Sequence, residues 1–424
     1  MSKHLAIGRP LVPGKTAAER RWAVVSLMDS TGSGMIAPLT VLYFTRFAGL
    51  SAASVGRGLA LAGIAALCLV PLAGVATDRF GPRRTLMAYW AMSAAAYAAH
   101  ALVHAWLPFV VVTAAALASG YSTKSVKQAY LAELSSGDDR VRLMAFQRSV
   151  RNAGFALGGL LSALALVFGN AGYLAVVLGN AVSYCAAMAL LPPAPAGSAA
   201  AVAAAGRRVL RWGDYRHVLA DTRYTALTAL DFLVCFQATA LVVALPLWVA
   251  SHTSVPDALV GVLFTLNTLL VVLLQMRVAA RASSLADVPR LYTRSALLFG
   301  CAAAVYLLAG HAPPILAVAF LVIAVSAHSA MELYASTAEW TVAAELADPE
   351  RRGAYLAVFW SGSSLQQVLG PVIVTSVLTL NTTVLWPIVA AAAAVGCLLS
   401  ARIVRRSASR ANAVVPAAGI PSTL

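Results

Sequence analysis

Charged residues are scarce in this chain. Asp, Glu, Lys and Arg make up 11% of its 424 residues, whereas 60% are hydrophobic and the mean hydropathy is +0.79. A water-soluble domain needs about 25% charged residues to cover its surface. The shortage therefore excludes an ordinary soluble globular protein and favours a protein embedded in lipid.

Cysteine clusters and catalytic motifs are also missing. The five cysteines stand singly within apolar runs, without a CxxC pair or a histidine at metal-ligand spacing, so we expect them to fill the core. They are Cys68, Cys185, Cys235, Cys301 and Cys397. No GxxxxGK(S/T) loop, HExxH pair or Ser/His/Asp arrangement occurs at a plausible depth. We therefore expect no enzyme, no nucleotide-driven pump, no cofactor and no metal.

Apolar runs of about 20 residues recur along the chain, each long enough to cross about 30 Å of hydrocarbon. Twelve of them are predicted to be transmembrane helices, at 22–46, 54–77, 84–104, 107–132, 141–168, 172–191, 222–250, 256–279, 291–310, 314–341, 352–379 and 383–402. The predicted fold is an all-α membrane protein of two six-helix bundles, 22–191 and 222–402. Segments 1–21, 192–221 and 403–424 are predicted to be a cytoplasmic N-terminal segment, a linker and a tail.

The basic residues lie mainly on one side of the membrane. Of 31 Lys and Arg, 29 fall on the side that both termini share, and only Arg46 and Arg57 fall on the other. Cytoplasmic loops carry such an excess, so both termini are predicted to lie in the cytoplasm, with the protein in the cell membrane. The net charge of +15 is then a topology signal, and nucleic acid is not an expected partner. The basic first 21 residues lack an apolar core, so we expect no cleavable signal peptide.

The two predicted bundles show an internal repeat. The segment from Leu131, LAELSSGDDRVRLMAFQRSVRNAGFALGG, aligns without gaps with the segment from Ala343, AAELADPERRGAYLAVFWSGSSLQQVLGP, and eight of 29 positions are identical. About two or three matches are expected by chance. Parallel repeats of six helices are typical of carriers whose halves rock around a site near the midplane.

Residues 74–84 form a distinctive loop after the second predicted helix. They read GVATDRFGPRR, which fits the pattern GxxxD(R/K)xGx(R/K)(R/K). This loop resembles the signature of the major facilitator superfamily, in which it helps latch the outward-open state. The resemblance implies a gate role for its charged residues, which are Asp78, Arg79, Arg83 and Arg84. Gly74 would allow close helix approach, and Gly81 would turn the chain.

Two other patterns of that family are altered. Leu117 stands three residues before Gly120, where proton-driven drug exporters usually carry an arginine. The fifth predicted helix has no Gly-Pro pair, which occurs instead at residues 370–371 in the eleventh. Its Gly154 and Gly158 form a GxxxG, which predicts close packing on a neighbouring helix.

Ionisable residues inside the predicted spans are candidate functional groups, because burying each one costs about 2.5 to 3.5 kcal/mol. They fall on predicted helices 1, 4, 7 and 10, which line the central cavity in the resembled family. The substrate or proton-coupling candidates are Asp29, Asp231, His328 and Glu332, and the charges expected at the inner mouth are Lys124, Lys127 and Glu339. The alternative for each is a structural contact between helices.

The tenth predicted helix suggests a proton site. His328 and Glu332 are four residues apart and share a face with Glu339. A carboxyl group beside a histidine can exchange a proton near neutral pH, so we expect Glu332, with His328, to take up and release it. Lys127 and Glu339 occupy matching positions in the repeat, which suggests an ion pair between them.

The expected function is proton-coupled efflux of a drug or secondary metabolite by alternating access, in a bacterial protein that works as a monomer. A few acids in an otherwise apolar set of helices suit amphipathic or cationic solutes. Two alternatives stay open. One is nutrient uptake by proton symport, and the other is a membrane sensor that kept the carrier fold and lost transport.

Overall fold

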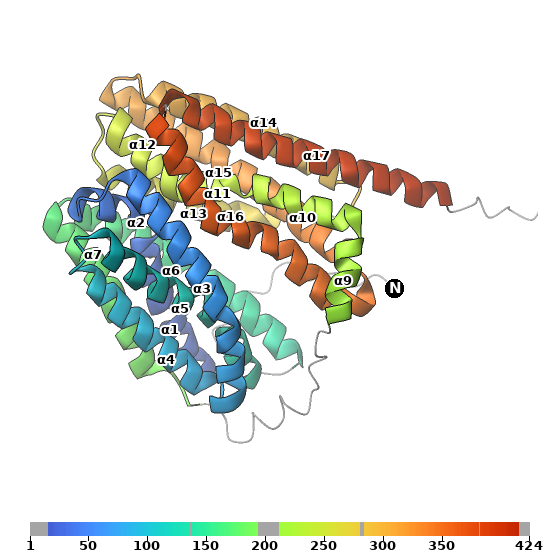
Figure 1. Cartoon of the computed structure of the whole chain (residues 1–424), viewed down its shortest axis with the longest axis horizontal. Helices are drawn as coiled ribbons and strands as arrows, with labels where there is room; N and C mark the ends of the chain where they lie inside the picture. Colours follow the sequence, from blue (N-terminus) through green and yellow to red (C-terminus); the bar gives the residue numbers. More distant parts are fainter. Residues whose placement is uncertain (1–15, 135–136, 194–211, 280–283, 381, 415–424) are drawn as a thin grey trace, which may run out of the picture. The chain divides into compact units, whose positions relative to one another are not determined.

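The computed structural model describes residues 16–134, 137–193, 212–279, 284–380 and 382–414, and within these ranges the regular structure is helical (Figure 1). The chain divides into two units. Unit 1 comprises Met1–Arg208 and Asp257–Thr265, and unit 2 comprises Val209–Pro256 and Leu266–Leu424.

Among its described residues, unit 1 has six long helices. Its elements are α1 (Ala17–Ile36), α2 (Thr40–Leu42), the π-helix η1 (Tyr43–Phe47), α3 (Ala52–Phe80), α4 (Pro82–His100), α5 (Trp106–Leu134), α6 (Gly137–Leu166) and α7 (Asn170–Leu190). The first predicted span is interrupted between α1 and α2, where Pro38 lies. Proline lacks a backbone donor and therefore breaks a helix interior.

Unit 2 begins with a short helix in the predicted linker. Its elements are α9 (Trp212–Ala220), α10 (Thr222–Val234), α11 (Phe236–Thr239), the π-helix η2 (Ala240–Ala244), α12 (Leu245–His252), α14 (Val288–Ala309), α15 (Pro314–Glu345), η3 (Pro349–Arg351), α16 (Arg352–Leu380), η4 (Thr382–Val384) and α17 (Leu385–Val414). Helix α13 (Ala258–Ala279) starts in unit 1 and continues in unit 2.

All twelve predicted spans coincide with helices. Within the described residues, nine helices are long and apolar enough to cross a membrane. The other three predicted spans correspond to α1, α4 and α16, whose sequences are richer in polar and small residues. In α1 these residues include Asp29 and the STGSG that follows it. The polar residues of α1 therefore belong to a buried ionic site and do not mark α1 as a surface helix.

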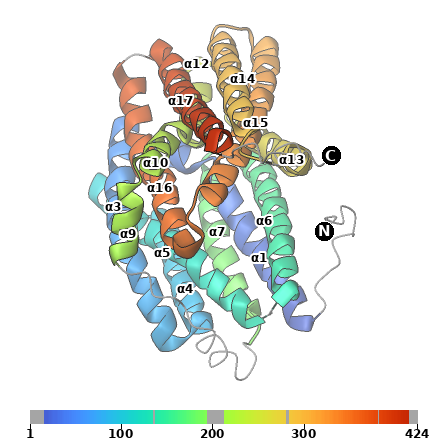
Figure 2. The same ribbon diagram turned by 90° about the vertical axis from the view of Figure 1, so that its right-hand side faces the viewer.

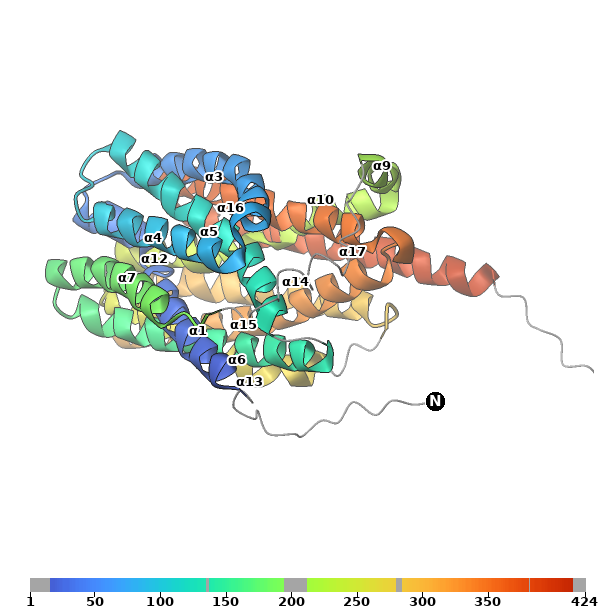
Figure 3. The same cartoon turned by 90° about the horizontal axis from the view of Figure 1, so that it is seen from below.

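Four helix pairs correspond between the two units. In unit 1, α1 packs on α6 and α7, and α4 packs on α5 and α7. In unit 2, the matching pairs are α10 with α16 and α17, and α14 with α15 and α17. Figures 2 and 3 show α1 beside α6 in unit 1. The repeat therefore extends beyond the aligned 29 residues to the packing of these helices.

Small residues bring α1 and α6 close together. A Cβ atom added to Gly154 would lie 2.7 Å from Ser30 Cβ, and one added to Gly158 would lie 2.6 Å from the backbone nitrogen of Met35. No side chain fits at either position without moving α1. The GxxxG of α6 is thus the packing face that the sequence predicted.

Candidate functional site

A buried ion pair joins α1 to α5 in unit 1. Lys127 Nζ lies 2.5 Å from Asp29 Oδ2, and the side chains are 20% and 9% exposed. The ammonium group also lies 5.6 Å from the centre of the Trp90 ring, close enough for a cation–π contact. Lys127 is therefore paired with Asp29 within unit 1, and its ion pair with Glu339 stays a prediction.

The neighbouring core holds this pair in place. Trp22 of α1, Trp90 of α4 and Tyr130 of α5 are almost fully buried in one apolar cluster. The Trp22 and Tyr130 rings pack with their centres 5.1 Å apart. Lys124, one turn before Lys127, is exposed and lies over the ring of Tyr121 at 5.6 Å. Of the two lysines of α5, Lys127 is thus the one that forms the ion pair.

Unit 2 places an acidic cluster at the corresponding position. Asp231 of α10, Cys235 and Glu339 of α15 have their ligand atoms within 4.8 Å of one another. Asp231 is 2% exposed and Glu339 is 8% exposed. The Cys235 thiol donates to Asp231 Oδ2 at 3.8 Å, whereas Asp231 Oδ1 has no hydrogen-bond partner among the described residues.

The two sites correspond residue by residue. Asp29 follows an Arg-Trp pair by seven residues, and Asp231 follows Arg-Tyr by the same spacing. Lys127 and Glu339 each lie four residues before the aligned segments, so they match when the ungapped alignment is extended. Unit 1 thus pairs an acid with a base, and unit 2 pairs an acid with an acid.

Two carboxylates this close, in a buried site, repel each other strongly. Across the residues that the structure describes, neither Asp231 nor Glu339 forms an ion pair with a lysine or arginine. The site is therefore stable only when a proton or another cation offsets one charge. Carboxylate and thiolate groups are cation ligands, so these three residues also have the chemistry to hold a metal ion.

His328 and Glu332 do not form the predicted pair. His328 Nε2 lies 3.0 Å from Gln237 Oε1, and its Nδ1 lies 3.3 Å from the Tyr306 hydroxyl. Both ring nitrogens are thus engaged by residues of α11 and α14. Four residues along a helix turn the side chain by about 40°, which is enough to give the two residues different neighbours.

Glu332 belongs to a second polar group on α15. Its Oε2 accepts a hydrogen bond from Asn267 Nδ2 at 3.0 Å, and the same amide donates to Ser329 Oγ at 3.0 Å. Asn267 therefore orients the Glu332 carboxylate.

The loop of residues 74–84 turns at Gly81, whose φ of +81° favours glycine. Arg83 Nε donates to the carbonyl of Pro192 at 3.0 Å, which ties the start of α4 to the end of α7. The Tyr130 hydroxyl donates to the same carbonyl at 2.7 Å. Arg83 therefore satisfies a carbonyl at a helix C-terminus, where a cation is favoured.

The other residues of this loop are less constrained. Arg79 and Arg84 are exposed. A Cβ atom at Gly74 would meet no other atom within 4 Å, so the predicted close approach at Gly74 does not involve another helix of unit 1. The side chain of Asp78 lies outside the described residues.

Sequence reasoning missed one member of the acidic cluster, Cys235, which it assigned to the core. The signal was present, because Cys235 follows Asp231 by four residues and therefore shares its helix face. Its position next to two acids depends on α15, which no local pattern reveals.

This all-helical arrangement of two repeated units has known counterparts. The family model of the Major Facilitator Superfamily matches residues 22–371. The chain therefore belongs to the Major Facilitator Superfamily, and it is a multi-pass membrane protein with the all-α transporter fold rather than an enzyme fold. The comparison with curated protein sequences gives no match.

Solved structures of similar fold include a point mutant of the nucleoside transporter NupG. It has a TM-score of 0.73 and 14% identity, with 91% of this chain and 99% of that chain covered. A POT family transporter in complex with 5-aminolevulinic acid has a TM-score of 0.71 and 12% identity, covering 93% and 99%. An auto-inhibited POT family peptide transporter has a TM-score of 0.69 and 14% identity, covering 93% and 97%. At these identities the similarity concerns the fold.

Proposed function

We propose that this protein is a secondary transporter that exports an amphipathic or cationic small molecule in exchange for protons. It works by alternating access in the cytoplasmic membrane of a bacterium, as a monomer with both termini in the cytoplasm. The single observation that carries the proposal is the buried pair of Asp231 and Glu339. A proton bound there can be released when a cationic substrate offsets the same charge.

The asymmetry between the units supports this assignment. The Asp29–Lys127 pair is neutral by itself, so it needs no ligand. The equivalent acids of unit 2, Asp231 and Glu339, carry an excess of negative charge when both are ionised. In this proposal a mobile cation offsets that charge. Coupling then follows from competition, since one site cannot hold a proton and a substrate cation at once.

The remaining candidates take supporting roles in the proposal. Glu332, held by Asn267, lies on the same helix as Glu339 and offers a second polar contact to the substrate. His328, fixed by two neighbours, orients α11 and α14. The loop of residues 74–84 acts as the cytoplasmic gate, with Arg83 setting its position at the end of α7.

The test is gradient-driven flux in proteoliposomes, using ethidium and related cationic dyes as probes. Asp231→Asn and Glu339→Gln should each lower flux driven by a pH gradient about tenfold or more, while exchange without a gradient persists. Glu345→Gln is the matched control, because Glu345 is an exposed residue of the same helix. Full gradient-driven flux in both acid variants would refute this site.

A second measurement is independent of the substrate. The carbonyl stretch of a protonated carboxyl group is visible by infrared spectroscopy, and it should disappear as the pH rises in the parent protein. Each acid variant should lack this pH-dependent band, whereas Glu332→Gln should retain it. Loss of the band in Glu332→Gln alone would move the proton site to Glu332.

A further inference from the structure

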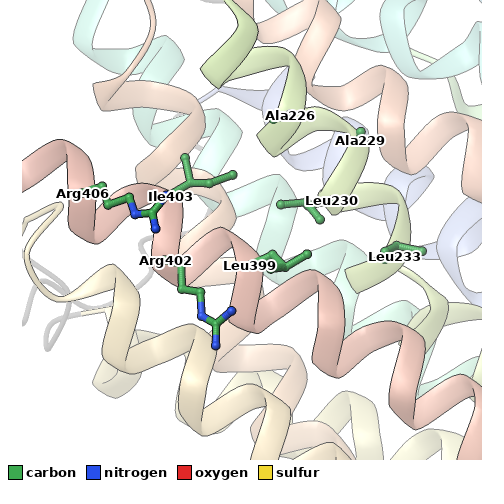
Figure 4. Close-up of a pocket in the computed structure, with 8 residues that line it drawn as sticks. All are labelled: Ala226, Ala229, Leu230, Leu233, Leu399, Arg402, Ile403 and Arg406. Atoms are coloured by element: carbon green, nitrogen blue, oxygen red, sulfur yellow. The ribbon is translucent and has the colours of Figure 1, made fainter.

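A groove of about 640 Å³ runs between α10 and α17 in unit 2 (Figure 4). Its walls are mostly alanine and leucine side chains, among them Ala226, Ala229 and Leu230 of α10 and Leu399 of α17. Two arginines of α17, Arg402 and Arg406, complete the lining. The groove is therefore apolar along its walls and basic along one helix.

Small residues create this groove. A Cβ atom at Gly396 would lie 2.9 Å from the carbonyl oxygen of Leu230, so the two helices approach closely there. Toward the start of α10, Ala226 and Ala229 present short side chains to α17. The space left above them is open at the protein surface.

The outward surface next to the groove is suited to lipid. Leu399 is 39% exposed, and its neighbours Leu398 and Val395 are 43% and 47% exposed. All three lie within the apolar span Thr382–Arg406. Exposed aliphatic side chains in a spanning segment meet acyl chains.

The arginines stand where lipid headgroups lie. The apolar span of α17 ends at Arg406, and the adjacent helix α10 begins at Thr222. Leu399 is seven residues from Arg406, which places it about 10 Å deeper. This end of the groove therefore coincides with the membrane surface, on the side where the basic loops are predicted.

The groove carries positive charge at this end. Arg402 and Arg406 are four residues apart and exposed, and neither forms an ion pair within the part of the chain that the structure describes. No acidic residue is among the described residues that line the groove. Arg223 lies three residues before Ala226, on the same helix face, and adds a third positive charge nearby.

We infer that this groove binds one anionic phospholipid of the cytoplasmic leaflet, with an acyl chain over Ala226, Ala229 and Leu399 and the phosphate between Arg402 and Arg406. Two guanidinium groups one helical turn apart bind a phosphate through charge-assisted hydrogen bonds. A zwitterionic lipid supplies the same chain but no net charge. The site therefore selects lipid by headgroup charge, and it is separate from the acidic cluster proposed for transport.

Native mass spectrometry of the full-length protein, titrated with phosphatidylglycerol or phosphatidylcholine, tests the inference. Phosphatidylglycerol should bind more tightly, and Arg402→Gln and Arg406→Gln should each weaken it about fivefold. The double variant should weaken it about thirtyfold if the two effects add. Arg405→Gln is the matched control, because Arg405 lies on α17 between the two arginines but does not line the groove.

Three further measurements keep the outcome decisive. Ala229→Trp fills the groove without changing charge and should also abolish phosphatidylglycerol binding. Soluble glycerol phosphate should not compete, which separates a lipid site from a site for free phosphate. Equal binding of the two lipids would overturn the inference, and so would unchanged binding by the double variant. If the arginine substitutions removed a protein dimer rather than a bound lipid, the groove would be a protein interface and the inference would also be overturned.

Discussion

At position 127 a lysine neutralises Asp29, and at the matching position of unit 2 a glutamate faces Asp231. The exchange of Lys127 for Glu339 between the repeats therefore replaces a charge-balanced ion pair with a site that needs a cation. This follows from charge balance alone, because both sites bury an aspartate at equivalent places on equivalent helices.

The Asp29–Lys127 pair should be structural, and a double-mutant cycle tests this. Asp29→Asn or Lys127→Gln alone leaves a buried charge without its partner and should lower the free energy of unfolding by about 2 to 4 kcal/mol. The double variant should be destabilised by less than the sum of the two single losses. Thermal unfolding in detergent measures all three, with Lys124→Gln as the exposed control. Additive losses would contradict a direct interaction.

Sequence reasoning found the buried charges but assigned their partners incorrectly. Spacing along one helix shows which residues share a face, so Glu332 and His328 were grouped together. Their actual partners, Asn267 and Gln237, come from other helices. Partner choice depends on how helices pack, and hydropathy carries no information about that.

Among the elements, the predicted spans and the observed helices agree in place but not in length. Helix α17 continues to Val414, beyond the predicted end at residue 402, and α1 begins at Ala17 instead of residue 22. Hydropathy marks where apolar sequence ends, whereas a helix continues as long as its backbone is satisfied. The π-helices η1 and η2 had no sequence signal that we recognised.

Contact between α1 and α6 should limit substitution at the GxxxG. Gly158→Val would force its side chain against the backbone of Met35 and should lower the free energy of unfolding by about 1 to 3 kcal/mol. Gly120→Val is the matched control, because a Cβ atom at Gly120 meets nothing within 4 Å. Both are measured by thermal unfolding in detergent. Equal stability of the two variants would show that α1 moves to accept the side chain.

For the whole molecule, the sequence alone predicted the helical architecture and the family. Hydropathy indicated twelve spans, the loop at residues 74–84 indicated the family, and the family match over residues 22–371 confirms it. Alternating access needs the two units to move against each other. Each unit contains the four corresponding helix pairs, which is consistent with two bodies that each keep their own internal contacts.

The sign of coupling distinguishes export by exchange from uptake with protons, whichever way the protein inserts. In proteoliposomes with an acidic lumen, protons flow outward, so an antiporter drives cationic dye into the lumen. A symporter carries its substrate outward with the protons. We expect dye to accumulate in an acidic lumen, to be expelled from an alkaline one, and to do neither after addition of a protonophore. Asp231→Asn should equilibrate dye under both gradients. Accumulation in an alkaline lumen would identify a symporter and overturn the proposed direction, leaving the acid pair as its proton site.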